Sequence, residues 1–256
     1  MRKSILYISM LLMCSLLVLT QPVLPDSSGA AEIWEKALAA KGGKDRLHAI
    51  ANFLVIHNRL RRSQIPYYSS LYILPNKYWL WENEGGVLGT KISANDGTGT
   101  WEAHNSGRYA GSGVTWWPPD KTDVRRILQD QALFLMETRS YRPKILELKT
   151  ERLGRVEYDV ITVDAGLDRV KYYIDRKTSL VRRVSPVERY GNVVTIAAEL
   201  VDYRPVQGIM VPSRIKYREG GTYDLKFAFD VEYDPEIFKR KPAIEDGPEG
   251  WKPAKK

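Results

Sequence analysis

The 256-residue sequence contains one cysteine, Cys14, and three histidines, His48, His57 and His104. A disulfide needs two cysteines, so the chain has to be stabilised by its own packed core. The histidines lie too far apart for the helical spacing of paired metal ligands. We expect His48 on a helix and His57 on the solvated face of a strand, and we expect no metal, no cofactor and no thiol nucleophile.

The motifs of common hydrolases and nucleotide-binding proteins are missing as well. The sequence contains no G-x-S-x-G elbow, no S-x-x-K and no papain-like cysteine. The glycine-rich residues 95–102 lack the lysine of a phosphate-binding loop. Acidic pairs such as Asp159 with Asp164 alternate with apolar residues, which is typical of a solvated strand face. We therefore predict that the protein is not an enzyme. A hydrolase with catalytic groups scattered across strands is the weakest alternative.

Basic residues outnumber acidic ones, with 39 Lys and Arg against 31 Asp and Glu. Without residues 1–31, which contain Arg2, Lys3 and Asp26, the net charge is +7. The basic residues are spread along strand-like segments and form no stripe on a helix, so we expect no nucleic-acid partner. Solvated faces explain most of this charge, and attraction to an anionic membrane surface is the second interpretation.

Residues 1–31 have the pattern of a secretory signal peptide. A short basic start precedes an apolar run at residues 5–20, and small residues follow at 27–31. The apolar run is shorter than the roughly 20 residues of a membrane-spanning helix. We expect an exported, periplasmic protein, and an association with the outer membrane stays open.

The remaining chain changes from a helical to a strand pattern near residue 50. Apolar residues recur at helical spacing over residues 30–50, with a break at Gly42-Gly43. Apolar and polar residues then alternate, and short turn sequences separate the segments, which favours antiparallel neighbours. We predict strands near residues 53–61, 67–73, 77–82, 88–94, 99–103, 144–150, 156–163, 169–174, 180–189, 193–203, 210–218 and 222–233.

One helical segment interrupts this pattern at residues 123–136, directly after Pro118-Pro119. The elements together predict a mainly β fold of the α+β class. Its core is a large curved antiparallel sheet of about 11–12 strands that forms a half-open β-barrel, with helices packed as a lid or plug. We expect residues 32–240 to form this single domain and residues 241–256 to form a flexible basic tail.

Aromatic side chains are the remaining candidates for function, with 15 Tyr and 7 Trp against 5 Phe. Such residues suit the wall of a binding cavity, and they equally fill the core of a large sheet. Both interpretations stay open. The candidates for an apolar cavity are Trp79, Trp81, Trp101, Trp116, Trp117, Leu135, Met136, Leu225, Phe227 and Phe229.

Four stretches together resemble exported bacterial proteins of the LolA/LolB-like superfamily of lipoprotein-sorting carriers. They are ALAAKGGKDRLHAIANFLVIHN (residues 37–58), YYIDRKTSLVRRV (172–184), LVDYRPVQGIMVPSRIKY (200–217) and FDVEYDPEIFKRKP (229–242). The resemblance implies an incomplete antiparallel barrel capped by helices, with an apolar cavity for acyl chains. These motifs mark strands and turns, so no ligand-contacting residue is transferred from the family. Residues 68–140 resemble it least.

We therefore expect a monomeric exported carrier that binds the acyl chains of a lipid or a lipoprotein. The alternative is a non-catalytic interaction module with a filled core, which docks on another periplasmic or outer-membrane protein.

Overall fold

A computed structural model describes residues 27–59, 67–85, 89–104, 108, 114–118, 121–165, 169–186, 197–217 and 221–238. Most of residues 1–31 and all of residues 241–256 therefore lie outside the described chain, as do the predicted strand positions 60–61, 88, 187–189, 193–196 and 218. The predicted signal peptide and basic tail stay predictions.

The described chain folds into one antiparallel sheet of thirteen strands, in the order β6-β5-β4-β3-β2-β1-β13-β12-β11-β10-β9-β8-β7. The strands are β1 (Asn52–Arg59), β2 (Tyr67–Ile73), β3 (Lys77–Gly85), β4 (Gly89–Asn95), β5 (Thr100–His104), β6 (Val114–Trp117), β7 (Lys144–Leu153), β8 (Val156–Asp164), β9 (Arg169–Asp175), β10 (Val181–Pro186), β11 (Ala198–Val206), β12 (Ile209–Tyr217) and β13 (Gly221–Phe229). The predicted mainly β class and curved antiparallel sheet are confirmed. Strand β6 was not predicted.

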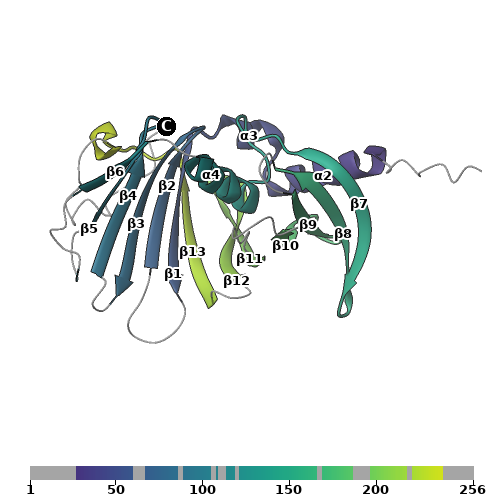
Figure 1. Cartoon of the computed structure of the whole chain (residues 1–256). Helices are drawn as coiled ribbons and strands as arrows, with labels where there is room; N and C mark the ends of the chain where they lie inside the picture. Colours follow the sequence, from purple (N-terminus) through teal and green to yellow (C-terminus); the bar gives the residue numbers. More distant parts are fainter. Residues whose placement is uncertain are drawn as a thin grey trace, which may run out of the picture.

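Strand β13 joins the two halves of the sheet, because it pairs with β1 on one side and with β12 on the other. Strands β6 and β7 form the two edges of the described sheet, so the sheet stays open. It curves around the helices as a half-barrel (Figure 1). Burial along β13 alternates as its sequence predicts, with Tyr223, Leu225, Phe227 and Phe229 buried.

Three described α-helices lie against the concave side: α2 (Ser27–Lys41), α3 (Lys44–Ala49) and α4 (Lys121–Phe134). Helices α2 and α3 are separated at Gly42-Gly43, as predicted. Figure 1 shows α4 lying across the mouth of the sheet in front of β13 and β11, with α2 and α3 beside the strands of the second half. None of these described helices is long and apolar enough to cross a membrane.

Both faces of the sheet bury apolar side chains. The concave core joins the three helices to strands of both halves. The convex core lies behind strands β1 to β5, and the 3-10 helix η1 (Pro235–Phe238) packs on it. Its buried residues are Leu54, Leu71, Trp79, Trp81, Ile92, Ala94, Trp101, Ala103, Val231, Ile237 and Phe238.

Candidate functional site

Helix α4 covers the apolar part of the concave face. The Phe134 ring at its end meets the Phe227 ring of β13 edge to face, with centroids 5.2 Å apart. The hydroxyl of Tyr172 on β9 donates a hydrogen bond to the Ala132 carbonyl at 2.9 Å. The C-terminal half of α4 therefore contacts both halves of the sheet.

Five of the ten predicted cavity residues lie together in this concave core, namely Leu135, Met136, Leu225, Phe227 and Phe229. They are buried, with exposed fractions of 8% for Phe227 and 2% for Phe229. Helix α4 and its neighbours fill the space in front of them. Their contact with a ligand stays a prediction.

The three tryptophans Trp79, Trp81 and Trp101 lie in the convex core, on the opposite face of the sheet. The indole nitrogen of Trp101 donates a hydrogen bond to the Phe238 carbonyl at 2.7 Å. They cannot line one cavity with Phe227, which corrects the predicted grouping. The reason is that strand β3 is buried on both faces, with Tyr78 and Leu80 in the concave core and Trp79 and Trp81 in the convex core.

The other two predicted tryptophans belong to the edge strand β6. Trp116 is 58% exposed, and its register partner Trp101 places it on the convex face. The side chain of Trp117 lies outside the described residues.

His57 is buried in the concave core, with an exposed fraction of 1%, and the prediction of a solvated position was wrong. Strand β1 lies in the middle of the sheet. His57 pairs with Leu225 and shares its concave face, whereas the next residue, Asn58, lies on the opposite face. The ring centroid of His57 lies 5.8 Å from that of Phe134. Burial lowers the pKa of His57 to about 3, so the imidazole is neutral.

A polar contact holds the middle of α4 to the first half of the sheet. The hydroxyl of Tyr72 on β2 donates a hydrogen bond to the Asp130 carboxylate. One turn earlier, the Arg126 guanidinium lies 5.7 Å from the ring centre of Tyr78 on β3. Burial raises the pKa of Asp130 to about 6, against the opposing effects of Tyr72 and Arg126. We call the Tyr72–Asp130 hydrogen bond the latch.

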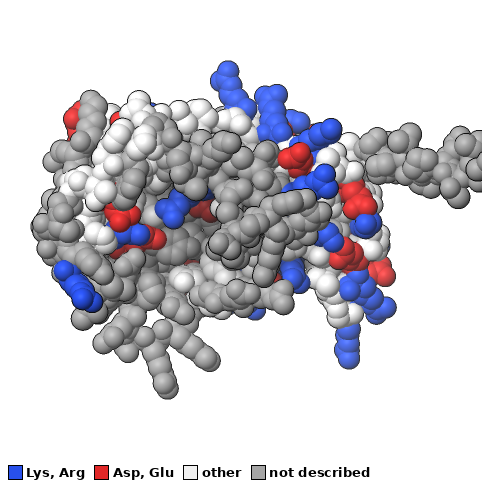
Figure 2. Space-filling view, viewed as in Figure 1, with Lys and Arg blue, Asp and Glu red and all other residues white. Residues whose placement is uncertain are grey.

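The concave face beyond the latch is charged. Glu82 on β3 and Lys91 on β4 form an ion pair of 3.0 Å, and Glu102 on β5 lies 3.7 Å from Lys91. His104 is 3.5 Å from Glu102, and Ser93 bonds the same carboxylate. Figure 2 shows red and blue atoms next to each other over these strands. The concave face is therefore apolar near β13 and polar near β4 and β5.

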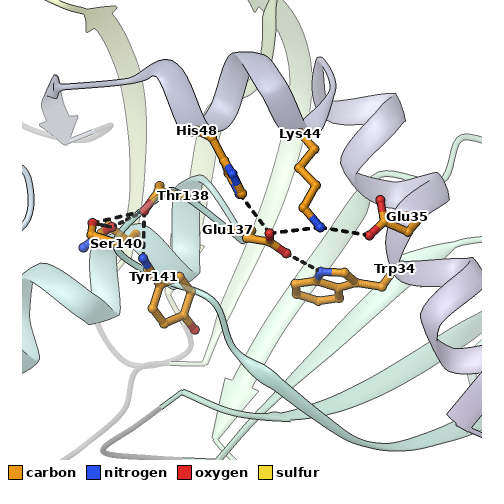
Figure 3. A network of polar contacts seen from close by, with 9 residues as sticks. Trp34, Glu35, Lys44, His48, Glu137, Thr138, Ser140 and Tyr141 are labelled. Atoms are coloured by element: carbon orange, nitrogen blue, oxygen red, sulfur yellow. Dashed lines mark hydrogen bonds and ion pairs between the residues drawn. The ribbon is translucent and has the colours of Figure 1, made fainter.

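A buried carboxylate fixes the chain just after α4. Glu137 accepts hydrogen bonds from the Trp34 indole at 3.0 Å and from His48 at 2.9 Å, and Lys44 lies 3.4 Å away (Figure 3). Burial alone would raise the pKa of Glu137, but these three partners outweigh it and lower the pKa. Sequence patterns did not point to this group, because its partners are far away in the chain.

A hollow of about 560 Å³ opens between α3 and the strand ends beside it. Its volume lies within the range of small-molecule pockets. Its lining combines apolar and charged groups and reaches the predicted residue Phe229. The lining residues are Gly42, Gly43, Lys44, Asp45, Arg46, Ala49, Ile50, Gln207, Ile209, Phe229 and Asp230.

A solved structure of a LolA superfamily protein from Nitrosomonas europaea matches this arrangement over 82% of this chain and 97% of that chain, with a TM-score of 0.50 and 14% identity. The chain has a LolA-like fold. This confirms the fold that the sequence resemblance implies.

Two further solved structures are more distant. An uncharacterised conserved protein from Thermus thermophilus matches 84% of this chain and 96% of that chain, with a TM-score of 0.33 and 11% identity. MucB in the MucA/MucB complex of Pseudomonas aeruginosa matches 78% of this chain and 57% of that chain, with a TM-score of 0.24 and 11% identity. These two scores support no conclusion about this chain. No family model and no curated protein sequence matches it.

The LolA-like half-barrel thus presents an apolar wall, one helix across it, a latch and a charged strip. Among the described residues, no group of three or more His, Cys, Asp or Glu side chains is arranged to hold a metal ion. The apolar wall is covered by α4, so a ligand can reach it only if α4 moves away from the sheet.

We expect Asp130→Asn to stabilise the protein at pH 7 and to have little effect at pH 4. The carboxyl titrates near its ordinary 3.8 in the unfolded chain and near 6 in the folded protein. The free energy of unfolding therefore falls as the pH rises through this interval. Above the interval the full cost of the charged carboxylate remains, roughly 3 kcal/mol. Asparagine keeps an acceptor for the Tyr72 hydroxyl without the charge.

Urea unfolding of both proteins at pH 4, 5, 6 and 7 measures this difference. Asp45→Asn, at an exposed position on α3, is the matched control and should show no such trend. A stability difference between Asp130→Asn and the parent that is the same at every pH would contradict the assignment.

Proposed function

We propose that this chain is an exported, non-catalytic carrier that binds the acyl chains of a lipid or lipoprotein on the concave face of the sheet, beneath α4. One observation carries this proposal: a single 14-residue helix covers the apolar wall of a LolA-like half-barrel. The basic start and apolar run at the N-terminus support export to the periplasm.

The energetics of the wall support an exchange between α4 and a ligand. Phe53, Val55 and Phe227 are buried on the concave face. Exposing each of these side chains would cost about 1.5–3 kcal/mol, and each buried methylene group of an acyl chain contributes about 0.8 kcal/mol. An acyl chain of ordinary length could therefore replace the apolar contacts that α4 makes with this wall.

The contacts of α4 differ between its two ends. Beyond its C-terminus the chain is fixed by Glu137, and the Thr138 hydroxyl donates a hydrogen bond of 2.7 Å to the Gln131 side chain. Met136 lies in the left-handed region with φ of 67°, which ends the helix sharply. Nearer its middle, α4 contacts the sheet through the latch, the Arg126–Tyr78 contact and the buried side chain of Ile127. We infer that α4 moves away from the sheet by pivoting at its C-terminal end.

Lipid mass spectrometry tests the proposal directly. Organic extraction of the purified protein should release acyl lipids in amounts comparable to the protein, and the delipidated protein should bind a fluorescent fatty-acid probe. Recovery of no lipid together with no probe binding would contradict the proposal and favour the alternative of an interaction module with a filled core.

The latch makes a kinetic prediction. Tyr72→Phe removes the hydroxyl that bonds Asp130 and keeps the ring, whose centroid lies 4.9 Å from that of Phe53. A hydrogen bond to a charged group is worth roughly 1.5–3 kcal/mol, so we expect probe uptake to become about tenfold faster or more. Stopped-flow fluorescence measures this rate.

Tyr173→Phe is the matched control. It removes a hydroxyl that donates a hydrogen bond of 3.1 Å to Glu151, and Tyr173 does not belong to the concave core. Its uptake rate should equal that of the parent. Equal rates for Tyr72→Phe and Tyr173→Phe would show that the latch does not limit entry.

A further inference from the structure

The hairpin of β7 and β8 extends beyond the rest of the sheet. The last register pair between β8 and β9 is Tyr158 with Asp175, so residues 153–157 lie past the end of the neighbouring strand. All of residues 152–157 are exposed. Figure 1 shows this tip projecting at the lower right of the molecule. We call residues 152–157 the hairpin tip.

Two apolar side chains lie side by side on the hairpin tip. Leu153 and Val156 are register partners, with exposed fractions of 37% and 43%. Neither belongs to the concave or the convex core. The other large exposed apolar side chains of the described chain, Val114 and Trp116, are on β6 at the opposite edge of the sheet.

The charge around this pair is positive. The acidic neighbours are already paired, Glu151 with Lys171 at 3.0 Å and Glu157 with Arg176 at 3.2 Å. Arg152 and Arg155, by contrast, form no ion pair with a carboxylate of the described residues. Figure 2 shows blue side chains around the end of the hairpin.

We propose that the hairpin tip is a docking site for an anionic lipid bilayer. Leu153 and Val156 enter the boundary between headgroups and acyl chains, while Arg152 and Arg155 bind the lipid phosphates. A guanidinium group can donate two parallel hydrogen bonds to the oxygens of one phosphate. Segments that anchor proteins at the membrane interface combine basic side chains with apolar ones. Each basic residue near an anionic surface strengthens binding about fivefold.

This site is separate from the proposed acyl-chain cavity, because it lies at the free end of the β7–β8 hairpin. Its failure would leave the cavity proposal unchanged, and the reverse is also true. Bilayer docking gives a carrier of acyl chains a defined orientation at the membrane.

Vesicle flotation tests the proposal. The full sequence, including residues 1–31, is expressed, and the protein is purified after any processing by the cell. Vesicles of phosphatidylglycerol and phosphatidylethanolamine are compared with vesicles of phosphatidylcholine alone. We expect binding to the anionic vesicles and a loss of about tenfold or more in Leu153→Ser/Val156→Ser. At low salt, Arg152→Glu/Arg155→Glu should reduce binding to anionic vesicles at least as much as Leu153→Ser/Val156→Ser does. At high salt its effect should be smaller.

The matched charge control is Arg139→Glu/Arg142→Glu, which changes the net charge equally at exposed positions between α4 and β7. Its binding to anionic vesicles should fall by no more than about twofold, because these arginines lie outside the hairpin tip.

The matched apolar control is Val114→Ser/Trp116→Ser on β6, which should bind the vesicles like the parent. All these side chains are exposed, so the variants keep the fold.

A site-specific probe gives a second readout. In a Cys14→Ser background, Val156→Cys provides the only cysteine for an environment-sensitive dye. Its emission should shift to the blue with anionic vesicles, whereas Lys177→Cys on the neighbouring turn should not shift. Equal vesicle binding by Leu153→Ser/Val156→Ser and the parent, or binding of the parent that is independent of anionic lipid, would overturn the proposal.

Discussion

The structure depends on covering the concave face of one large sheet. This face is apolar around β13, and buried apolar area stabilises a fold in proportion to its extent. Three described helices provide the cover. The Glu137 carboxylate links them, because it bonds Trp34 of α2 and His48 of α3 directly after the end of α4. Removing one partner of such a buried charged group is strongly destabilising, so this junction fixes where the helices lie.

The two parts of the cover differ in how they are held. Helix α2 packs on β7, β8 and β12 and shares the Glu137 junction. Helix α4 is fixed at its C-terminal end, and its middle is held by the latch to Tyr72. A helix fixed at one end over an apolar wall can be displaced without unfolding the sheet. The charged strip on β4 and β5 beyond the latch provides a polar border to that wall, which suits an amphiphilic ligand.

Local patterns explain most of the fold and only part of the site. Alternating apolar residues and short turns predicted the strands, because a period of two arises from the backbone itself. The same pattern shows that Trp79 and Trp81 share a face, but it cannot show which face is concave. His57 was misplaced because its strand is covered by a helix that is distant in sequence. The partners of Glu137 come from other elements, so no local pattern could reveal them. Strand β6 is too short for alternation to be recognised.

The central claim is that an acyl chain binds between α4 and the strands around β13. A crystal structure with a brominated fatty acid tests it most directly, because bromine is located by its anomalous scattering. The account predicts bromine between α4 and the side chains of Phe53 and Phe227, with the Tyr72–Asp130 latch broken and Ile127 displaced from the concave core. Bromine on the convex side beside Trp79 and Trp101, or a concave core that excludes the fatty acid entirely, would contradict it.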